Sequence, residues 1–389
     1  MISFENTEIA FRSKSDNDLK RSYFLFKTLS HNSLVKLGGS LTQSAIKMHI
    51  PVNWVVKPTI YKQFVGGETI EECGPTVRNL QEYNVKAILD YSVEGKESED
   101  DIKAALAETL RSINNAGKNS NIPFAVFKPT AFTTPDILEN VSADKKLTDR
   151  EKLEAERFKT RIETLCNAAY ESNIPILIDA EDSWFQNFID EVVNKMMAKF
   201  NKEKAIIFNT FQMYRHDRLG FLEESYQKAV DGNYFLGAKF VRGAYMEKER
   251  ERAHELGYPS PIQPDKDSTD RDYNAALKFC VEHIDRITIF NGTHNEYSAG
   301  YLAELMEQKG LQKNDPRVWF SQLFGMSDHI SFNLADAGYN VAKYLPYGPV
   351  KHVIPYLVRR AEENTSVKGQ TGRELSLISK EMSRRRSKN

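Results

Sequence analysis

Ionisable side chains stand at the ends of two apolar runs of this sequence. Asp179 and Glu181 follow the run Ile174–Ile178, and their spacing of two places both carboxylates on one face of an extended chain. Lys239 lies inside a second apolar run, and Arg242 directly follows it. Lysine and arginine are seldom buried without partners. These residues therefore indicate a site for a charged ligand; the alternatives are acids at a helix start and cations on the surface.

Two further features would suit an acidic ligand. Gly243-Ala244 follow Arg242 and would let a ligand approach the backbone closely. Arg359-Arg360 follow an apolar helical stretch, and the planar guanidinium binds a carboxylate through two hydrogen bonds. Adjacent helical residues point about 100° apart, so the two arginines need not face the same ligand. As part of a converging set, they suggest a substrate with an acidic group.

Several classes of protein are not indicated. No G-x-G-x-x-G follows a predicted strand, and neither G-x-x-x-x-G-K-[ST] nor H-E-x-x-H occurs. The eight histidines do not cluster with metal-ligand spacing, so we expect no metal. A formal net charge of -1 provides no basic excess for nucleic acid as a partner. The composition, 40% hydrophobic and 28% charged, favours a globular protein.

Short apolar runs alternate with charged helical stretches after Gly66-Gly67. Such runs suit strands that are buried on both faces of a parallel sheet. Eight strand–helix pairs over about 300 residues match a (βα)8 TIM-type barrel, while a doubly wound open sheet stays possible because one sequence does not reveal strand order. The predicted strands are Tyr61–Val65, Lys86–Leu89, Phe124–Phe127, Ile174–Ile178, Ala205–Phe208, Gly237–Val241, Thr288–Phe290 and Val318–Phe320.

The polar ends of these strands favour the barrel. Barrel active sites lie at the carboxyl ends of the strands, where side chains from several strands converge. One or two polar strand ends would mean little, because strands meet solvent there. The whole set is Lys128, Asp179 with Glu181, Asn209 with Gln212, Arg242, Thr293 with His294, and Gln322.

The chain divides into three predicted parts. Residues 1–55 form a helical N-terminal arm, residues 56–364 form the barrel, and residues 365–389 form a basic, frayed tail. Two predicted helices have capping signals: Ser98 precedes acidic residues, and Ser183 has Gln186 three positions later. The other predicted helices are Asp149–Ser172 and Asp270–His283.

The predicted location is the cytoplasm. No apolar run approaches the roughly 20 residues that cross a bilayer, and the first residues lack the layout of a secretory signal. Cys73, Cys166 and Cys280 are odd in number and widely spread, which fits a reducing compartment. Peripheral contact with the inner membrane stays open.

Nine ordered segments of the chain resemble proline dehydrogenases, closest to the monofunctional, eukaryote-like branch. The resemblance covers about Gln63 to Asn364. The segments are KQFVGGE (62–68), AILDYSVE (87–94), IDAEDSWFQ (178–186), IFNTFQMY (207–214), AKFVRGAYMEKER (238–250), THNEYS (293–298), FSQLFGMSD (320–328), KYLPYGPV (343–350) and YLVRRAEEN (356–364).

The resemblance implies an FAD-dependent barrel that oxidises L-proline to pyrroline-5-carboxylate. A hydride would pass to flavin N5 and the electrons to a membrane quinone. Lys128, Arg359 and Arg360 match cations that hold the proline carboxylate, Tyr344 matches the residue lining the pyrrolidine ring, Glu363 matches a residue that orients an arginine, and Asp179 matches the aspartate beside flavin and substrate. Flavin-contacting positions are matched by Asn209, Lys239, Arg242, Gly243, Ala244, Thr293 and His294.

Two positions depart from many bacterial members, which carry arginine in place of Lys239 and glutamine in place of Asn209. An ammonium is not equivalent to a guanidinium fork, so the redox tuning of the flavin is left open. For the transfer of a hydride to the flavin, the hypothesis is that Lys239 stabilises the charge that develops on the flavin.

Three other functions remain alternatives. Hydroxyproline oxidation is the nearest, although the bulk of Tyr344 favours unsubstituted proline. A Schiff-base aldolase would use Lys128 or Lys239 as its nucleophile. A non-catalytic barrel is the third, and the intact polar set argues against it.

Overall fold

The computed structural model describes residues 2–30, 53–93, 98–366 and 370–387. The chain divides into two compact units, one of residues 95–321 and one of residues 2–94 with 322–389, and the division falls inside strand β7. Each unit is described by itself. Part of the predicted N-terminal arm, residues 31–52, lies outside the described residues.

All strands are parallel, and their order is β1-β8-β7-β6-β5-β4-β3-β2. In this order each strand follows its sequence neighbour, with β1 beside β8. A doubly wound sheet reverses its order in the middle, so that alternative is excluded and the (βα)8 barrel is confirmed.

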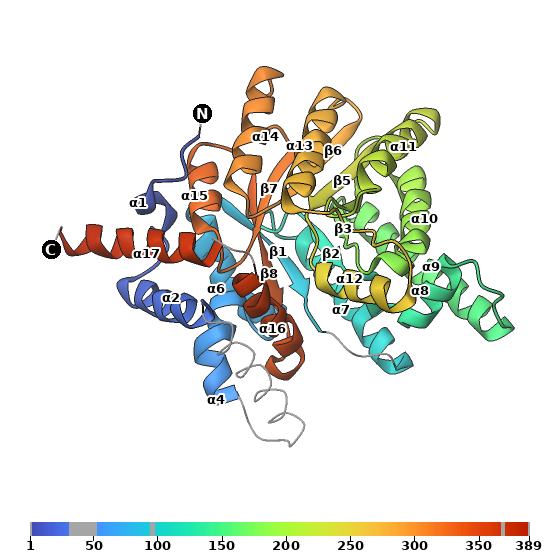
Figure 1. Cartoon of the computed structure of the whole chain (residues 1–389), viewed down its shortest axis with the longest axis horizontal. Coiled ribbons are helices and arrows are strands. Elements are labelled where there is room, and N and C mark those ends of the chain that lie inside the picture. The colour runs from blue at the N-terminus through green and yellow to red at the C-terminus, as the bar shows by residue number, and fades with distance from the viewer. Residues whose placement is uncertain (1, 31–52, 94–97, 367–369, 388–389) are drawn as a thin grey trace. The chain divides into compact units, whose positions relative to one another are not determined.

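The unit of residues 95–321 holds β2 to β6 and most of β7 (Figure 1). Its strands are buried along almost their whole length, because helices cover one face and the other face is internal. The strands are β2 Ala125–Phe127, β3 Ile176–Ile178, β4 Ile207–Gln212, β5 Leu236–Val241, β6 Ile287–Gly292 and β7 Val318–Leu323. The helices are α7 Glu99–Gly117, η2 Pro129–Ala131, α8 Pro135–Ser142, α9 Asp149–Glu171, α10 Ser183–Phe200, α11 Arg218–Asp231, α12 Met246–Leu256, α13 Lys266–Glu282 and α14 Glu296–Gln308.

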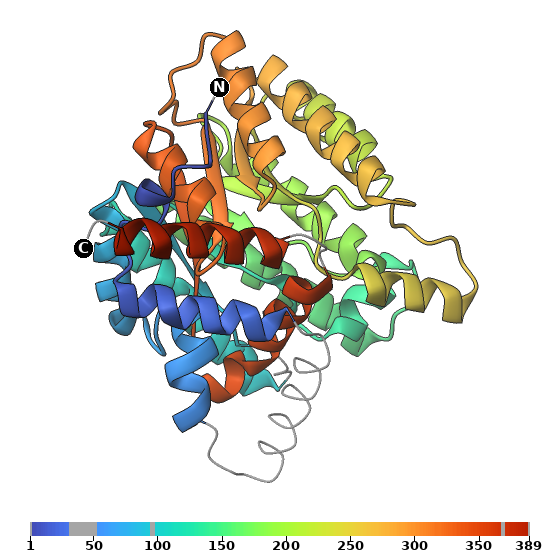
Figure 2. The same cartoon turned by 60° about the vertical axis from the view of Figure 1, so that its left-hand side comes forward.

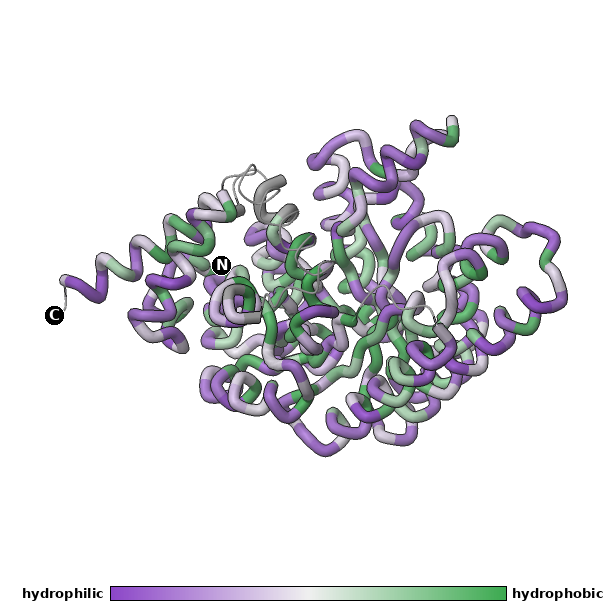
Figure 3. Tube along the Cα trace, turned by 90° about the horizontal axis from the view of Figure 1, so that it is seen from below, coloured by the Kyte–Doolittle hydropathy of each residue, from purple (hydrophilic) through white to green (hydrophobic). Residues whose placement is uncertain are grey.

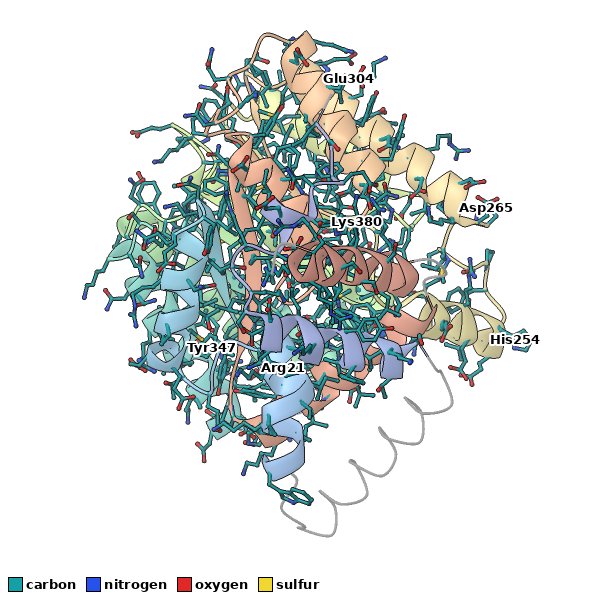
Figure 4. The ribbon with its side chains drawn as sticks, turned by 90° about the vertical axis from the view of Figure 1, so that its left-hand side faces the viewer. Arg21, His254, Asp265, Glu304, Tyr347 and Lys380 are labelled. Atoms are coloured by element: carbon teal, nitrogen blue, oxygen red, sulfur yellow. The ribbon has the colours of Figure 1, made fainter. Side chains whose placement is uncertain are left out.

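Side-chain caps begin several of these helices. The Ser98 hydroxyl accepts a hydrogen bond from the Asp101 amide at 3.2 Å, which confirms the predicted start of α7. Asp265, labelled in Figure 4, caps α13 by accepting from the Ser268 amide. The tube of Figure 3 is mostly green along the strands and carries much purple on the helices, as expected for strands enclosed by amphipathic helices.

The second unit holds the parallel pair of β1 and β8 and a group of helices. Helices α2 and α17 lie side by side (Figure 2), and Figure 4 labels Arg21 on α2 and Lys380 on α17. Its strands are β1 Val85–Tyr91 and β8 Val341–Tyr347, and its helices are α1 Thr7–Ala10, α2 Asp16–Leu29, α4 Asn53–Val56, η1 Lys57–Tyr61, α5 Lys62–Phe64, α6 Ile70–Gln81, α15 Asp328–Asp336, α16 Val350–Ser366 and α17 Gln370–Arg386.

Three sequence-based predictions are wrong in this second unit. Tyr61–Val65 is not a strand: helical turns lie there, because Tyr61, Phe64 and Val65 have the spacing of one helical face and pack in a buried cluster. The eighth strand is β8, which was not predicted. The tail is not frayed over Gln370–Arg386, since Leu377 and Ile378 of α17 are buried.

Candidate functional site

A carboxylate between two ammonium groups lies at the strand ends of the first unit. Asp179 directly follows β3, Lys128 directly follows β2, and Lys239 lies in β5. Lys239 Nζ is 2.5 Å from Asp179 Oδ1, and Lys128 Nζ is 3.4 Å from Asp179 Oδ2. The structure thus brings together three of the predicted site residues, from three strands.

The position of Lys239 follows from the two-residue period of β5. Lys239 is paired in register with Thr210 of β4, whereas the next residue, Phe240, stacks on Phe211 on the opposite face of the sheet. Only 5% of Lys239 is exposed, so its charge depends on a buried partner. Asp179 supplies that partner.

Glu181 fixes the loop between β3 and α10. Its carboxylate accepts the Thr130 amide at 2.9 Å and the Thr130 hydroxyl at 2.7 Å, and its carbonyl accepts from Gln212 Nε2 at 3.0 Å. Burial raises the pKa of Glu181 to about 7, although the two hydrogen bonds from Thr130 oppose that rise. The loop after β2, which carries Lys128, and the loop after β3 are thereby joined.

The predicted capping box of Ser183 with Gln186 is wrong. Ser183 is the first residue of α10, and its amide and hydroxyl both donate to Glu249 of α12, at 2.7 and 2.5 Å. Gln186 instead accepts the Glu181 amide at 3.0 Å. A carboxylate distant in the sequence therefore caps this helix, and local spacing did not reveal it.

Arg242 is held by three side chains of its own unit. Its Nε donates to Asp270 at 2.8 Å, Nη1 to Thr293 Oγ1 at 2.7 Å, and Nη2 to Ser298 Oγ at 3.0 Å. The guanidinium also lies 4.4 Å from the centre of the Tyr273 ring. Arg242 and Thr293 are thus brought together, and the half-buried His294 follows Thr293 in the chain.

Gly243 and Ala244 leave the backbone open after β5. Both residues are exposed, and Gly243 has φ +134°. A Cβ at Gly243 would lie 2.4 Å from the Tyr214 ring, so no larger residue fits without a shift. Backbone groups are accessible here, as the sequence predicted.

Asn209 turns its side chain away from these groups. Its Nδ2 donates to Asp190 of α10 at 2.9 Å, and its Oδ1 accepts the Thr210 amide at 2.9 Å. Gln212, three residues later, is paired in register with Val241 and so shares the face of Lys239. Gln212 Oε1 is buried and has no hydrogen-bond partner among the described residues.

Gln212 is thus a candidate for ligand binding, whereas the sequence indicated only that it follows a strand. The predicted strand Ala205–Phe208 ended too early, which placed Asn209 at the strand end, whereas β4 runs to Gln212. Counting in twos from Phe208 would have found it.

The other predicted substrate residues belong to the second unit. Tyr344 lies in β8 and is 7% exposed. Arg359 and Arg360 lie in α16, where Arg360 is buried with its guanidinium 5.3 Å from the centre of the Tyr356 ring. Glu363 lies in the same helix, and its side chain is outside the described residues.

A family model and a full-length relative of this chain carry the same name, and another relative carries a different one. The model of a family described as "Proline dehydrogenase" matches residues 73–373. The chain is 37% identical to the carbapenem antibiotics biosynthesis protein CarD of Pectobacterium carotovorum subsp. carotovorum, over 83% of this chain and 83% of that protein. It is 32% identical to proline dehydrogenase 1, mitochondrial, of Dictyostelium discoideum, over 98% of this chain and 74% of that protein.

A solved structure supports the fold. Proline utilization A from Bdellovibrio bacteriovorus, inactivated by N-propargylglycine, superposes with a TM-score of 0.73 at 20% identity. The match covers 92% of this chain and 38% of that chain.

Proposed function

The chain belongs to the proline dehydrogenase family, and on that premise we propose that it oxidises L-proline to pyrroline-5-carboxylate with FAD as its cofactor. The observation that carries the proposal is the group of Lys128, Asp179 and Lys239 at the carboxyl ends of three parallel strands, where barrel enzymes have their active sites.

The residues of the first unit fit a flavin. Gln212 Oε1 is a buried acceptor without a partner among the described residues, so it would suit a donor on a bound ring. The exposed backbone at Gly243-Ala244 would suit close approach of a polar cofactor. The residues proposed to hold FAD are Lys239, Arg242, Gly243, Ala244, Thr293 and His294, with Gln212 favoured over Asn209.

FAD would supply the acceptor for the hydride that leaves proline. The protein's own task is then to bind and orient the substrate. Lys128, Arg359 and Arg360 would hold the carboxylate through charge-assisted hydrogen bonds, and Tyr344 would pack against the ring. Glu363 would orient one of the arginines. Asp179 would balance Lys128 and Lys239, so that both ammonium groups keep fixed positions in a partly buried site.

The same ion pair argues against a Schiff-base aldolase. A nucleophilic lysine must lose its proton, whereas a carboxylate at 2.5 Å from Lys239 Nζ favours the protonated ammonium. Trapping by borohydride with a carbonyl substrate would detect the aldolase directly.

A membrane quinone is the proposed electron acceptor, with the protein in the cytoplasm and in peripheral contact with the inner membrane. Among the described residues, no helix has the length and apolar character needed to span a bilayer.

The decisive experiment is an anaerobic visible spectrum of the purified protein before and after L-proline is added. We expect a flavin spectrum that bleaches with proline, and less readily with hydroxyproline. A flavin that stays oxidised with proline would refute the substrate. A colourless protein that cannot be reconstituted with FAD would refute the cofactor and favour the aldolase or a non-catalytic barrel.

A further inference from the structure

Behind the strand ends of the first unit lies a buried carboxylate to which the proposed chemistry gives no task. Asp190 of α10 is 4% exposed. Its Oδ1 accepts from Asn209 Nδ2 at 2.9 Å and from Gln186 Nε2 at 3.0 Å. Its Oδ2 accepts from Arg218 Nη1 at 2.7 Å. Burying the carboxylate of Asp190, the amides of Gln186 and Asn209 and the Arg218 guanidinium together costs free energy unless each polar group has a hydrogen-bond partner.

The Asp190 carboxylate, paired with Arg218, decides the orientation of two side-chain amides. A carboxylate only accepts hydrogen bonds, so Gln186 and Asn209 must both turn their NH2 groups toward Asp190. Their oxygens then face the other way. Gln186 Oε1 accepts the Glu181 amide at 3.0 Å, and Asn209 Oδ1 accepts the Thr210 amide at 2.9 Å.

Both of these backbone amides belong to segments that carry site residues. Glu181 lies two residues after Asp179, in a loop of three residues between the last residue of β3 and the N-cap Asp182. Thr210 is the register partner of Lys239. Asp190 is therefore linked through Gln186 to the loop that carries Asp179. Through Asn209 it is linked to the backbone of Thr210, which is paired with Lys239.

We propose that Asp190 is a positioning residue: by fixing the amides of Gln186 and Asn209, it sets the backbone that holds Asp179 against Lys239. Its importance for catalysis rests on the proposed function, whereas its control of the loop does not.

Arg218 provides the counter-charge without taking part in the amide relay. Its Nε and Nη2 donate to Asp217, at 3.1 and 2.6 Å, and Arg215 donates to the same carboxylate. Asp217 thus shares the arginine with Asp190 but contacts neither Gln186 nor Asn209 among the hydrogen bonds of the described residues. It is a matched control, because its loss disturbs the same ion cluster and leaves the relay intact.

Hydrogen exchange at the Glu181 amide tests the relay directly. In Asp190→Leu, a side chain of similar shape offers no acceptor to either amide, so Gln186 and Asn209 lose the group that orients them. We expect the Glu181 or Thr210 amide to exchange at least tenfold faster than in the wild type, after correction for global stability. Asp217→Leu should leave both rates within twofold. Equal protection in Asp190→Leu and the wild type would overturn the proposal.

Gln186→Met covers the case in which Asp190→Leu does not fold. The substitution keeps the Asp190–Arg218 ion pair and a side chain of similar shape, and it removes the one amide that bonds both Asp190 and the Glu181 backbone. We expect the Glu181 amide to lose the same protection, and the double variant to lose no more than the single variants do, because both act through one contact. Unchanged protection in Gln186→Met, or additive effects, would contradict the relay.

The kcat for proline oxidation distinguishes the positioning role of Asp190 from the proposed function. If the protein is a proline dehydrogenase, Asp190→Leu should lower kcat by tenfold or more, and Asp217→Leu by less than twofold. Faster exchange with no effect on kcat would refute the positioning role. If the wild type has no proline oxidation, the proposed function fails, and the exchange rates still decide whether Asp190 orders the loop.

Discussion

The two units contain the same small constellation, one aspartate between two lysines, in different surroundings. In the first unit, Asp179 lies 2.5 Å from Lys239 and 3.4 Å from Lys128, and 19% of the Lys128 side chain is exposed. In the second unit, Asp328 lies 2.9 Å from Lys343 and 3.1 Å from Lys14.

The second constellation has a more deeply buried centre, although 18% of the Lys14 side chain is exposed. Lys343 is 0% exposed, and its ammonium also donates to the Met326 carbonyl at 2.5 Å. Asp328 begins α15, Lys343 lies in the middle of β8, and Lys14 precedes α2, so these contacts join three segments of the unit. Its groups are engaged with protein atoms, which makes it a structural tie.

The difference between the two constellations shows that residue type alone does not define a site. Asp179 and Lys128 follow strand ends, where further polar groups from the same edge gather, and they remain partly exposed. Asp328 and Lys343 form an ion pair of which only 8% and 1% of the side chains are exposed, and it joins a helix start to a strand. Substitutions in the first should therefore reduce activity, and substitutions in the second should reduce stability.

Asp179→Ala should have the largest effect on activity. It removes both charge-assisted contacts, about 3 kcal/mol or more in total, which corresponds to a loss of about 100-fold or more in kcat/KM. Steady-state kinetics with proline and a quinone analogue measure this loss. Full activity in a folded variant would remove Asp179 from the site.

Asp328→Ala should instead destabilise the protein by about 3–5 kcal/mol, because Lys343 is left as a buried charge with one partner fewer. Chemical denaturation measures the change. The kcat of the molecules that remain folded should stay within threefold of the wild type. A large loss of kcat without a loss of stability would break the distinction between the two constellations.

Glu181 should give the Asp179 loop a pH dependence. Its pKa is raised from 4.5 to about 7 in the folded protein, mainly by burial, so its stabilising contribution is complete below pH 4.5 and is lost as the pH rises through 7. The free energy of unfolding falls by about 3 kcal/mol at most over this pH range. Denaturation at pH 5 and pH 8 should show a smaller difference for Glu181→Gln than for the wild type; equal differences would argue that Glu181 is not buried as described.

Arg359→Met should raise KM for proline by more than tenfold, since a hydrogen bond to a charged group contributes about 1.5–3 kcal/mol. Arg359→Lys, which keeps the charge but not the planar fork, should have a smaller effect. Titration of initial rates with proline gives both values. An unchanged KM in Arg359→Met would exclude this arginine from the carboxylate site.

Asp328 should make the stability of the second constellation sensitive to acid, with a smaller change in the free energy of unfolding. Burial alone would raise its pKa, but the charges of Lys14 and Lys343 lower it from 3.8 to about 2. Its contribution is therefore present above pH 3.8 and lost as the pH falls toward 2, a change of about 2 kcal/mol. Acid denaturation should show this loss in the wild type, and a variant with Asp328→Asn should lack it.

The sequence determined the alternation of strands and helices and most strand positions. Seven of the predicted runs overlap strands of the structure, because short buried runs between amphipathic helices have few other solutions. Asp179, Lys128, Lys239 and Arg242 could be named as site candidates because they end or interrupt such runs. Strand β8 was missed for the opposite reason: Lys343 and Pro346 interrupt its apolar pattern. The buried lysine is tolerable because Asp328 and the Met326 carbonyl, outside the strand, accept from it.

Only the tertiary structure decided the roles of residues that look alike in sequence. The end of β4 at Gln212, the cap of α10 by Glu249 and the hydrogen bond from Asn209 to Asp190 all depend on partners between 19 and 66 residues away. The spacing of residues along the sequence does not identify such partners. Hydrogen bonds and ion pairs are short-ranged, so whether a charged side chain forms a site or a structural tie is decided by which atoms the fold brings within about 3 Å of it.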